Sequence, residues 1–484
     1  MNKVLFVSSE AYPLIKTGGL ADVAGSLPRA LIKQGLDVRL LLPAYPAVLE
    51  KVSNPKLINE QVHYGQTVQL LETRLPGTRV TVWLVNCPAA FDRPGTPYLD
   101  ENGKEWSDND FRFALFSQVA ANIAMGHSQL SWKPDVVHCN DWQSALVPAL
   151  LSIHKKRPAT IFTIHNLSYQ GVFNKQTFSD LHLPQQLWTL HSLEFHDRVS
   201  FIKGGLVHAD RITTVSPSYA EEIQTPEFGY GLNELLLHRR NKLSGIINGI
   251  DTDVWNPGTD ACLTQKFNKR SLGKKADNKI SFQTEMGLPK EQNIPLLGMV
   301  GRLVEQKGID TILDALLALL QLPVQIVILG TGEQQFETRL TQLAKRFPDK
   351  LRVIIGYDEC LSHRVEAASD IYLMPSKFEP CGLNQLYSLR YGTLPIVRNV
   401  GGLADTVINT TEESIENRTA TGFYVADNNP ASLISAVKFA IKLYEDPSTW
   451  NQLQLNAMSQ DFSWEKSAEK YKDLYNVVIK ENQQ

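Results

Sequence analysis

Short apolar runs alternate with helical patterns along the whole chain. Each run holds four to seven mostly apolar residues, the length of a strand buried in a parallel sheet. The runs are 4–8, 37–42, 81–86, 135–138, 160–164, 211–215, 294–300, 324–329, 351–355, 370–374 and 394–397. Between them, apolar residues recur at helical spacing, as at Leu20, Val23 and Leu27. Strands alternating with helices predict an α/β protein with parallel sheets.

A long polar stretch divides this pattern into two halves. It runs from 248 to about 292 and is rich in Asn, Lys, Asp and Gly. We therefore predict an N-terminal Rossmann-like domain over 1–245, a hinge over 246–257 and a second Rossmann-like domain over 258–462. The aromatic stripe in 463–484 predicts a helix that packs back on the first domain. Two doubly wound sheets joined by a hinge would face a deep cleft, a common place for small-molecule sites.

A glycine turn follows the first predicted strand. Lys16 and Thr17 precede Gly18 and Gly19, and a helical pattern begins at this turn. Glycines allow close approach of the backbone to phosphate, and a helix N-terminus carries partial positive charge. A nearly identical stretch, 401–406, repeats 18–23 and places Gly401 and Gly402 in the second half. Either copy alone could be a tight turn, but two copies favour a ligand role.

Polar residues and glycines follow most of the other predicted strands. In the first half they include Glu10, Asp141, His165 and Asn166; in the second half they include Arg302, Gly356, Tyr357, Glu379, Gly401 and Gly402. In open α/β sheets, ligands bind at the carboxyl ends of the strands. Each residue could instead serve a turn, but together they predict a site.

Three charged residues of the second half suggest chemistry directly. Arg302 and Lys307 lie five residues apart after a strand, and such cations could hold a diphosphate and stabilise it as a leaving group. Glu379 precedes a Pro and a Gly at a strand end and could face a sugar. Alternatively, Arg302 and Lys307 could be solvent-exposed cations without a ligand, and Glu379 could bind backbone N–H groups at a helix start.

Composition narrows the function classes. The net charge of -3 and pI of about 6.4 give no sign of a nucleic-acid or anionic-membrane partner. Five scattered cysteines without a C-x-x-C pair argue against a disulfide framework or a zinc site. No leader or membrane span is recognisable, so we expect a cytoplasmic protein. The acid pair Asp251 and Asp253 suits a turn better than a metal, so no cofactor is expected.

Four motifs together resemble one enzyme family. They are KTGGLADV at 16–23, RLVEQKG at 302–308, EPCGL at 379–383 and GGLADT at 401–406. As a set they are similar to the bacterial glycogen synthases and plant starch synthases, over nearly the whole chain. The resemblance implies a GT-B fold and a retaining glycosyltransferase. Such an enzyme transfers glucose from ADP-glucose to the 4-OH at the non-reducing end of an α-1,4-glucan.

The resemblance also implies roles for single residues. Lys16, Gly18 and Gly19 would approach the donor, Arg302 and Lys307 would bind its diphosphate, and Glu379 would face the glucosyl unit. His165 would lie near the reacting carbon, Asp141 would contact a sugar hydroxyl, and Tyr357 would line the base pocket. The implied substrate-binding set also includes Asn166, Asn248, Cys381, Gly382, Leu383, Gly401 and Gly402, with Tyr98 and Asn109 on the acceptor side.

Several alternatives stay open at this stage. Related transferases often carry a second Glu eight residues after the first, but here that residue is Tyr387, which favours a front-face mechanism over a double displacement. A nicotinamide-dependent oxidoreductase is a rival, although Gln335 breaks its glycine fingerprint after Gly330 and Gly332. A non-catalytic glucan-binding protein is a second rival. No residue decides between ADP-glucose and UDP-glucose.

Overall fold

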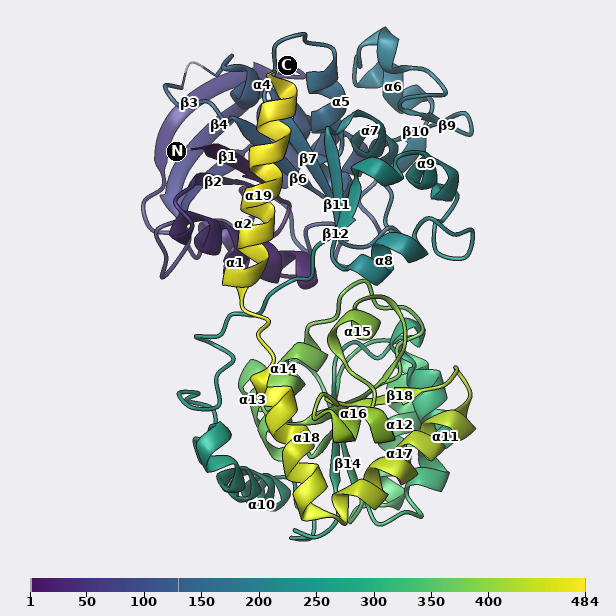
Figure 1. Cartoon of the computed structure of the whole chain (residues 1–484). Coiled ribbons are helices and arrows are strands. Elements are labelled where there is room, and N and C mark those ends of the chain that lie inside the picture. Colours follow the sequence, from purple (N-terminus) through teal and green to yellow (C-terminus); the bar gives the residue numbers. More distant parts are fainter. Residues whose placement is uncertain (1, 129, 484) are drawn as a thin grey trace. The chain divides into compact units, whose positions relative to one another are not determined.

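The chain forms two compact units. The computed structural model describes residues 2–128 and 130–483. Unit 1 comprises Met1–Gly249 and Ser463–Gln484, and unit 2 comprises Ile250–Phe462 (Figure 1). The chain passes from unit 1 to unit 2 inside the segment 246–257. It returns to unit 1 at residue 463, just before the C-terminal helix.

Unit 1 is built on a nine-stranded sheet. The strand order is β12-β11-β7-β6-β1-β2-β5-β4-β3. The strands are β1 (Lys3–Val7), β2 (Asp37–Pro43), β3 (Lys56–His63), β4 (Gln66–Arg74), β5 (Thr81–Asn86), β6 (Val136–Asn140), β7 (Ala159–Ile164), β11 (Arg211–Thr214) and β12 (Leu243–Gly245). The order reverses at β1, which pairs in parallel with both β2 and β6.

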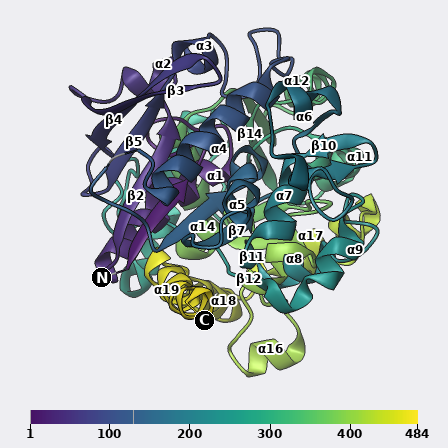
Figure 2. The same cartoon turned by 90° about the horizontal axis from the view of Figure 1, so that it is seen from above.

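The antiparallel strands β3 and β4 at one edge were not predicted. Figure 2 shows β4 beside β5, which separates it from β2. Their residues are mostly half-buried or exposed, so they lack the continuous apolar run of a strand buried on both faces. A small second sheet is formed by β8 (Val172–Asn174), β10 (Arg198–Ser200) and β9 (Glu194–Phe195).

Helices complete unit 1. They are α1 (Gly19–Lys33), α2 (Pro46–Leu49), α3 (Pro88–Phe91), α4 (Asn109–Met125), α5 (Leu146–Ser152), α6 (Gln176–Asp180), α7 (Phe201–His208), α8 (Pro217–Glu222), α9 (Asn233–His238) and α19 (Trp464–Asn482). Figure 1 shows α19, in yellow, beside α1 and across the sheet. Its aromatic stripe is core, because Trp464, Tyr471 and Tyr475 are all buried and the Tyr475 hydroxyl lies 2.7 Å from Nδ1 of His138.

Unit 2 is built on a six-stranded, fully parallel sheet in the order β15-β14-β13-β16-β17-β18. The strands are β13 (Leu296–Val300), β14 (Gln325–Gly330), β15 (Leu351–Ile355), β16 (Ile371–Met374), β17 (Leu394–Arg398) and β18 (Phe423–Val425). The helices are α10 (Lys275–Glu285), α11 (Ile309–Leu319), α12 (Gln334–Arg346), α13 (Glu359–Ala368), α14 (Asn384–Arg390), α15 (Gly401–Thr406), α16 (Glu412–Glu416), α17 (Pro430–Tyr444) and α18 (Pro447–Ser459).

Alternate residues of the strands in unit 2 enter separate hydrophobic clusters. Ile326 and Ile328 of β14 pack with α11 and α17, whereas Val327 and Leu329 pack with α10 and α13. Since successive side chains of a strand point to opposite faces, both faces of this sheet are covered by helices. The prediction of α/β domains with doubly wound parallel sheets is confirmed.

One pair of cysteines contradicts the expectation against a disulfide framework. Cys262 and Cys360 form a disulfide with Cα atoms 5.3 Å apart, although 98 residues separate them in sequence. Cys87, Cys139 and Cys381 are buried and take no part in a disulfide. The expectation was wrong because it used sequence spacing, whereas the pairing depends on the fold bringing the segment after the unit boundary to the start of α13.

Thiol titration should detect this bond. Protein purified and denatured without a reductant is expected to show three reactive thiols per chain, and five after reduction. In a Cys262→Ser variant the unreduced count should rise to four: Cys87, Cys139 and Cys381, which take no part in the disulfide, plus the released Cys360. Five reactive thiols in the unreduced wild-type protein would contradict the pairing.

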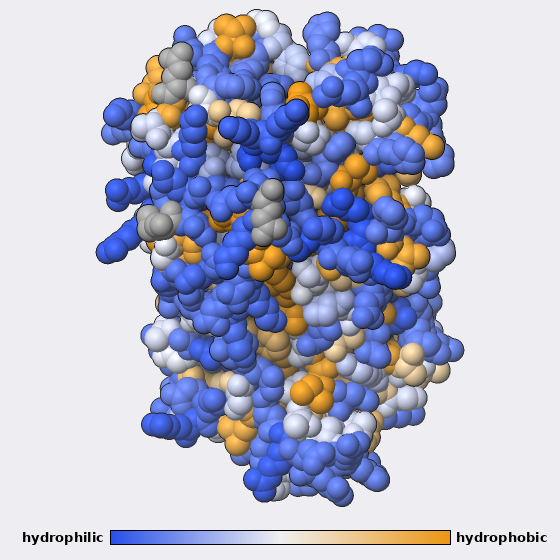
Figure 3. Space-filling view, turned by 45° about the horizontal axis from the view of Figure 1, so that its top comes forward, coloured by the Kyte–Doolittle hydropathy of each residue, from blue (hydrophilic) through white to orange (hydrophobic). Residues whose placement is uncertain are grey.

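The surface is mainly polar where it can be seen. Figure 3 shows a face on which hydrophilic residues surround scattered apolar ones. Among the residues that the structure describes, no helix combines the length and the apolar character that crossing a membrane requires.

Candidate active site

In unit 1, the site residues collect where the strand order reverses. The carboxyl ends of β7, β6 and β1 are adjacent in the sheet. They are followed by His165, Asp141 and Glu10 respectively. Such a reversal is where open α/β sheets bind ligands.

His165 is held as a neutral ring. Its Nε2 lies 2.9 Å from Oδ1 of Asn140, whose amide nitrogen donates to the carbonyl of Val7 at 3.0 Å. The Asn140 oxygen therefore faces the ring, so Nε2 of His165 donates and Nδ1 carries the lone pair. Burial lowers the pKa of His165 to about 3. At neutral pH this side chain can orient a sugar hydroxyl but brings no positive charge.

Asp141 lies beside His165 and is joined to it through the backbone. Its Oδ1 accepts a hydrogen bond of 2.7 Å from the backbone N–H of His165. Burial raises the pKa of Asp141 from its ordinary value of 3.8 to about 7, against the opposing effect of the His165 and Asn166 N–H groups. Its backbone is in the left-handed region, with φ of 54°. A non-Gly residue held there is typical of functional sites.

The shifted pKa makes a prediction about stability. Between pH 3.8 and about 7 the unfolded chain has released the Asp141 proton while the folded protein keeps it, so raising the pH destabilises the fold by at most about 1.4 kcal/mol per unit. Asp141→Asn removes this loss. In urea unfolding at pH 5 and pH 7, the variant should gain stability relative to the wild type as the pH rises. A constant difference would contradict the shift.

The glycine turn is exposed on the surface of unit 1. The Lys16 ammonium pairs with Asp22 at 2.7 Å, and the Lys16 side chain is 37% exposed. A Cβ added to Gly18 or Gly19 would meet no other atom within 4 Å. The packing of unit 1 therefore does not require glycine at either position, which is consistent with a bare surface kept for a ligand.

Four other predicted residues of unit 1 have structural partners or a buried setting. Asn166 caps a turn, because its Oδ1 accepts from the N–H and hydroxyl of Ser168 at 3.0 and 2.7 Å. Asn109 is buried and donates to the carbonyl of Tyr98 at 3.1 Å, so it supports Tyr98. The Tyr98 hydroxyl donates to Glu10 at 2.5 Å. Asn248 is 6% exposed, and its Oδ1 is a buried atom without a hydrogen-bond partner.

In unit 2, Lys307 and Glu379 form an ion pair at the carboxyl edge of the sheet. Lys307 Nζ lies 2.5 Å from Glu379 Oε2, which also accepts from the Ser376 hydroxyl at 3.1 Å. The side chain of Glu379 is 7% exposed and that of Lys307 is 20% exposed. Lys307 follows β13 and Glu379 follows β16, and these strands are neighbours in the sheet. The structure thus brings together two residues that are 72 apart in sequence.

Arg302 and Tyr357 lie on exposed parts of the same edge. The Arg302 guanidinium donates to Gln306 at 3.2 Å, and Arg302 is exposed. Tyr357 follows β15 and is 70% exposed. The preceding Gly356 has φ of 145°, where an added Cβ would be strained, although no atom lies within 4 Å of it. An exposed cation and an exposed aromatic ring are suited to a phosphate and a base.

The second glycine pair differs from the first. A Cβ on Gly402 would lie 2.2 Å from the carbonyl oxygen of Cys381, so the fold itself requires glycine there. The Gly402 N–H donates to the carbonyl of Glu379 at 3.0 Å, which connects the two loops. Gly401 and Gly382 have φ of 45° and 74°. The repeated sequence therefore has a packing role in unit 2 that it lacks in unit 1.

Cys381 and Leu383 also belong to this loop. Cys381 is buried at 4% exposure. Leu383 packs against the cluster of Ile250, Leu386 and Tyr387. The ring of Tyr387, eight residues after Glu379, is stacked on that of Trp255 with centroids 3.7 Å apart. This position thus holds a packed aromatic ring where a double displacement would need a second carboxylate.

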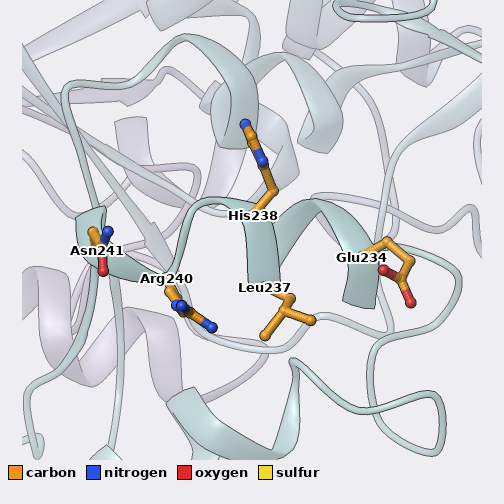
Figure 4. Close-up of a pocket in the computed structure, with 5 residues that line it drawn as sticks. All are labelled: Glu234, Leu237, His238, Arg240 and Asn241. Carbon is orange, nitrogen blue, oxygen red and sulfur yellow. The ribbon is translucent and has the colours of Figure 1, made fainter.

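A shallow pocket of about 380 Å³ lies elsewhere in unit 1. Figure 4 shows its lining residues on α9 and the turn that follows: Glu234, Leu237, His238, Arg240 and Asn241. None of the predicted site residues lines it. Across residues 2–128 and 130–483, no three His, Cys, Asp or Glu side chains group as metal ligands would. Asp251 instead accepts from the backbone N–H of Asp253 at 2.9 Å, as in a turn.

Family comparisons cover both units. The starch synthase catalytic domain matches residues 3–238, and the glycosyl transferases group 1 family matches residues 283–454. The catalytic domain of starch synthase IV from Arabidopsis thaliana, solved with ADP and acarbose, is similar with a TM-score of 0.90 and 34% identity, over 99% of each chain. The sucrose-phosphate synthase of Thermosynechococcus elongatus has a TM-score of 0.62 at 17% identity, which shows the fold alone.

Full-length relatives agree with these matches. The glycogen synthase of Cellvibrio japonicus is 54% identical over 98% of this chain and 99% of its own length. Glycogen synthase 1 of Methylococcus capsulatus is 54% identical over 99% of this chain and 97% of its own. These findings exclude the nicotinamide-dependent oxidoreductase and confirm the resemblance drawn from the motifs. With the GT-B fold shared with starch synthase IV, they show that this chain belongs to the glycogen synthase and starch synthase family of glycosyltransferases.

Proposed function

We propose that this chain works as a glycogen synthase in the cytoplasm. It transfers glucose from ADP-glucose to the 4-OH at the non-reducing end of an α-1,4-glucan, with retention of configuration. The observation that supports this most directly is the Lys307–Glu379 ion pair at the carboxyl edge of the sheet in unit 2, on a fold similar to a starch synthase solved with ADP and acarbose. The partners are the nucleotide sugar and the glucan; neither nucleic acid nor a membrane takes part.

In this proposal Arg302 and Lys307 bind the diphosphate of the donor. As the bond between the sugar and the phosphate breaks, negative charge grows on the departing ADP. Fixed cations near that charge stabilise the transition state more than the bound substrate. Lys307 is suited to this because its ion pair with Glu379 already fixes its position. Gly18, Gly19 and Lys16 add further contacts to the donor.

Glu379 and His165 act at the sugar. The carboxylate of Glu379 stabilises the positive, oxocarbenium-like character of the glucosyl unit. Neutral His165 and Asp141 hold sugar hydroxyls. The packed Tyr387 favours a front-face reaction, in which the departing phosphate takes the proton of the acceptor 4-OH. The new bond then forms on the face that the phosphate leaves, which retains the configuration.

No metal is needed in this scheme, since the two cations perform the task that a divalent ion would perform. Activity with ADP-glucose and glycogen is therefore expected to survive prolonged treatment with EDTA within about twofold. Measuring the rate again after adding Mg²⁺ provides the control. A rate abolished by EDTA and restored by Mg²⁺ would contradict the metal-free scheme.

Donor choice is the finer part of the proposal. The test is a side-by-side assay of ADP-glucose and UDP-glucose with glycogen as acceptor, measuring nucleoside diphosphate release and incorporation of glucose. We expect ADP-glucose to be the better substrate by kcat/KM. A higher kcat/KM with UDP-glucose would overturn the donor assignment and leave the glycosyltransferase assignment intact. No transfer from either donor would favour a non-catalytic glucan-binding protein.

A further inference from the structure

A buried carboxylate lies directly beneath the glycine turn of unit 1. Glu10 is 3% exposed and follows β1, the strand at which the sheet order reverses. Its Oε2 accepts from the backbone N–H groups of Thr17 at 2.5 Å and Gly18 at 3.2 Å. Its Oε1 accepts from the hydroxyls of Thr17 at 2.6 Å and Tyr98 at 2.5 Å. Four donors therefore converge on one buried acid.

The remaining contacts of Glu10 fix its own position. Its carbonyl accepts from the buried Ser8 hydroxyl at 2.7 Å. The Tyr98 hydroxyl also lies 2.8 Å from that of Ser9. Burial and the negative charge of Glu10 raise the pKa of Tyr98, so its hydroxyl stays protonated and keeps donating. Glu10 is thus a rigid anchor that links β1, the Tyr98 segment and the turn.

The turn is hydrogen-bonded to Glu10 but has no packing against its glycines. On the Glu10 side, the hydroxyl of Thr17 and two backbone N–H groups are bound to the carboxylate. Added Cβ atoms at Gly18 and Gly19, in contrast, would meet nothing within 4 Å. Gly18 is also the N-cap of α1, which has no side-chain cap of its own. A carboxylate near that helix N-terminus is electrostatically favourable. Glu10 therefore holds the turn through hydrogen bonds, while no atom of the described residues packs against the Cβ positions of its two glycines.

We propose that Glu10 is a positioning residue for the sugar donor. It holds the turn in the shape in which Lys16 and the Gly18–Gly19 backbone meet ADP-glucose. This role rests on the proposed function. An anchored turn binds its ligand without first losing conformational freedom, whereas an untethered one must be ordered when the donor arrives. Loss of Glu10 should therefore weaken donor binding more than it slows the chemical step.

The test is Glu10→Gln, which keeps the size of the side chain but turns one acceptor oxygen into an NH₂ group that faces N–H and O–H donors. We expect the KM for ADP-glucose to rise about tenfold while kcat changes less than threefold. In a Lys16→Ala background the same change should raise KM by less than threefold, because both substitutions act through one turn. Thr17→Val should give a smaller rise of the same sign, and Thr17→Ser should restore the wild-type KM.

Asp210→Asn is the matched control. Asp210 accepts from the N–H and hydroxyl of Thr160 at 2.8 and 2.9 Å and pairs with Arg157, but at the amino ends of the strands. Its loss should lower the melting temperature without changing KM. Two results would overturn the role of Glu10 and leave the proposed function standing. One is an unchanged KM in both Glu10→Gln and Thr17→Val. The other is a KM increase in the double variant equal to the product of the increases in Glu10→Gln and Lys16→Ala. Wild-type protein that transfers no glucose from ADP-glucose would overturn the proposed function, and this role with it.

Discussion

Lys307→Ala is expected to lower kcat for glucosyl transfer by about 10²–10³-fold, the range seen when one group that stabilises transition-state charge is removed. It should also weaken ADP binding, because the diphosphate loses a cation. The cause is the position of Lys307, 2.5 Å from Glu379 at the carboxyl edge of the sheet in unit 2. Steady-state kinetics with ADP-glucose and glycogen, together with calorimetric titration of ADP, would measure both effects.

Breaking any buried ion pair can destabilise a protein, so this loss needs a matched control. Lys279 pairs with Asp370 at 2.7 Å in the same unit, but Asp370 immediately precedes β16 and so lies at the amino edge. Lys279→Met should lower the melting temperature and leave kcat within about twofold. If Lys307→Ala retained kcat within about threefold, or if both variants lost kcat equally, Lys307 would have no special role in charge stabilisation.

Glu379→Ala is the second large effect, with an expected fall in kcat of about 10²-fold or more, since an oxocarbenium-like centre loses its facing carboxylate. Here ADP should bind at least as tightly as to the wild type. Removing the carboxylate frees Lys307 from its partner and leaves its charge for the diphosphate. The two members of one ion pair are thus expected to change ADP affinity in opposite directions.

Calorimetric titration of ADP into the wild type, Glu379→Ala and Glu379→Gln distinguishes a specific loss of the carboxylate from misfolding of the variant. Glu379→Gln keeps the volume of the side chain and an acceptor for the Ser376 hydroxyl, so it should retain the fold while losing the negative charge. Undiminished transfer by Glu379→Ala would remove the catalytic assignment. A loss of ADP affinity in both variants would indicate that Glu379 supports the diphosphate site instead of acting at the sugar.

The buried parallel strands were the most predictable part of the fold. The runs 81–86 and 160–164 match β5 and β7 to within one residue, because strands covered on both faces are continuously apolar. Strand β3 was missed for the opposite reason, since most of its residues are half-buried or exposed. The three-residue strand β18 is too short to show a pattern.

Among the site residues, those at strand ends could be predicted because parallel strands bring their carboxyl ends to one edge. What each residue does there depends on partners that are distant in sequence. The Lys307–Glu379 pair, the stack of Tyr387 on Trp255 and the disulfide between Cys262 and Cys360 all join separate segments. Glu10 is an example: the sequence predicted its position after β1, but not the four hydrogen-bond donors that converge on it.

The most direct test of the proposed reaction is to follow a short α-1,4-glucan and ADP-glucose by proton NMR in the presence of the purified protein. We predict growth of the α-1,4 anomeric signal in step with the release of ADP, one linkage for each ADP. Release of ADP with free glucose and no longer glucan, or appearance of a β-anomeric linkage, would contradict the proposal of a retaining α-1,4-glucan synthase.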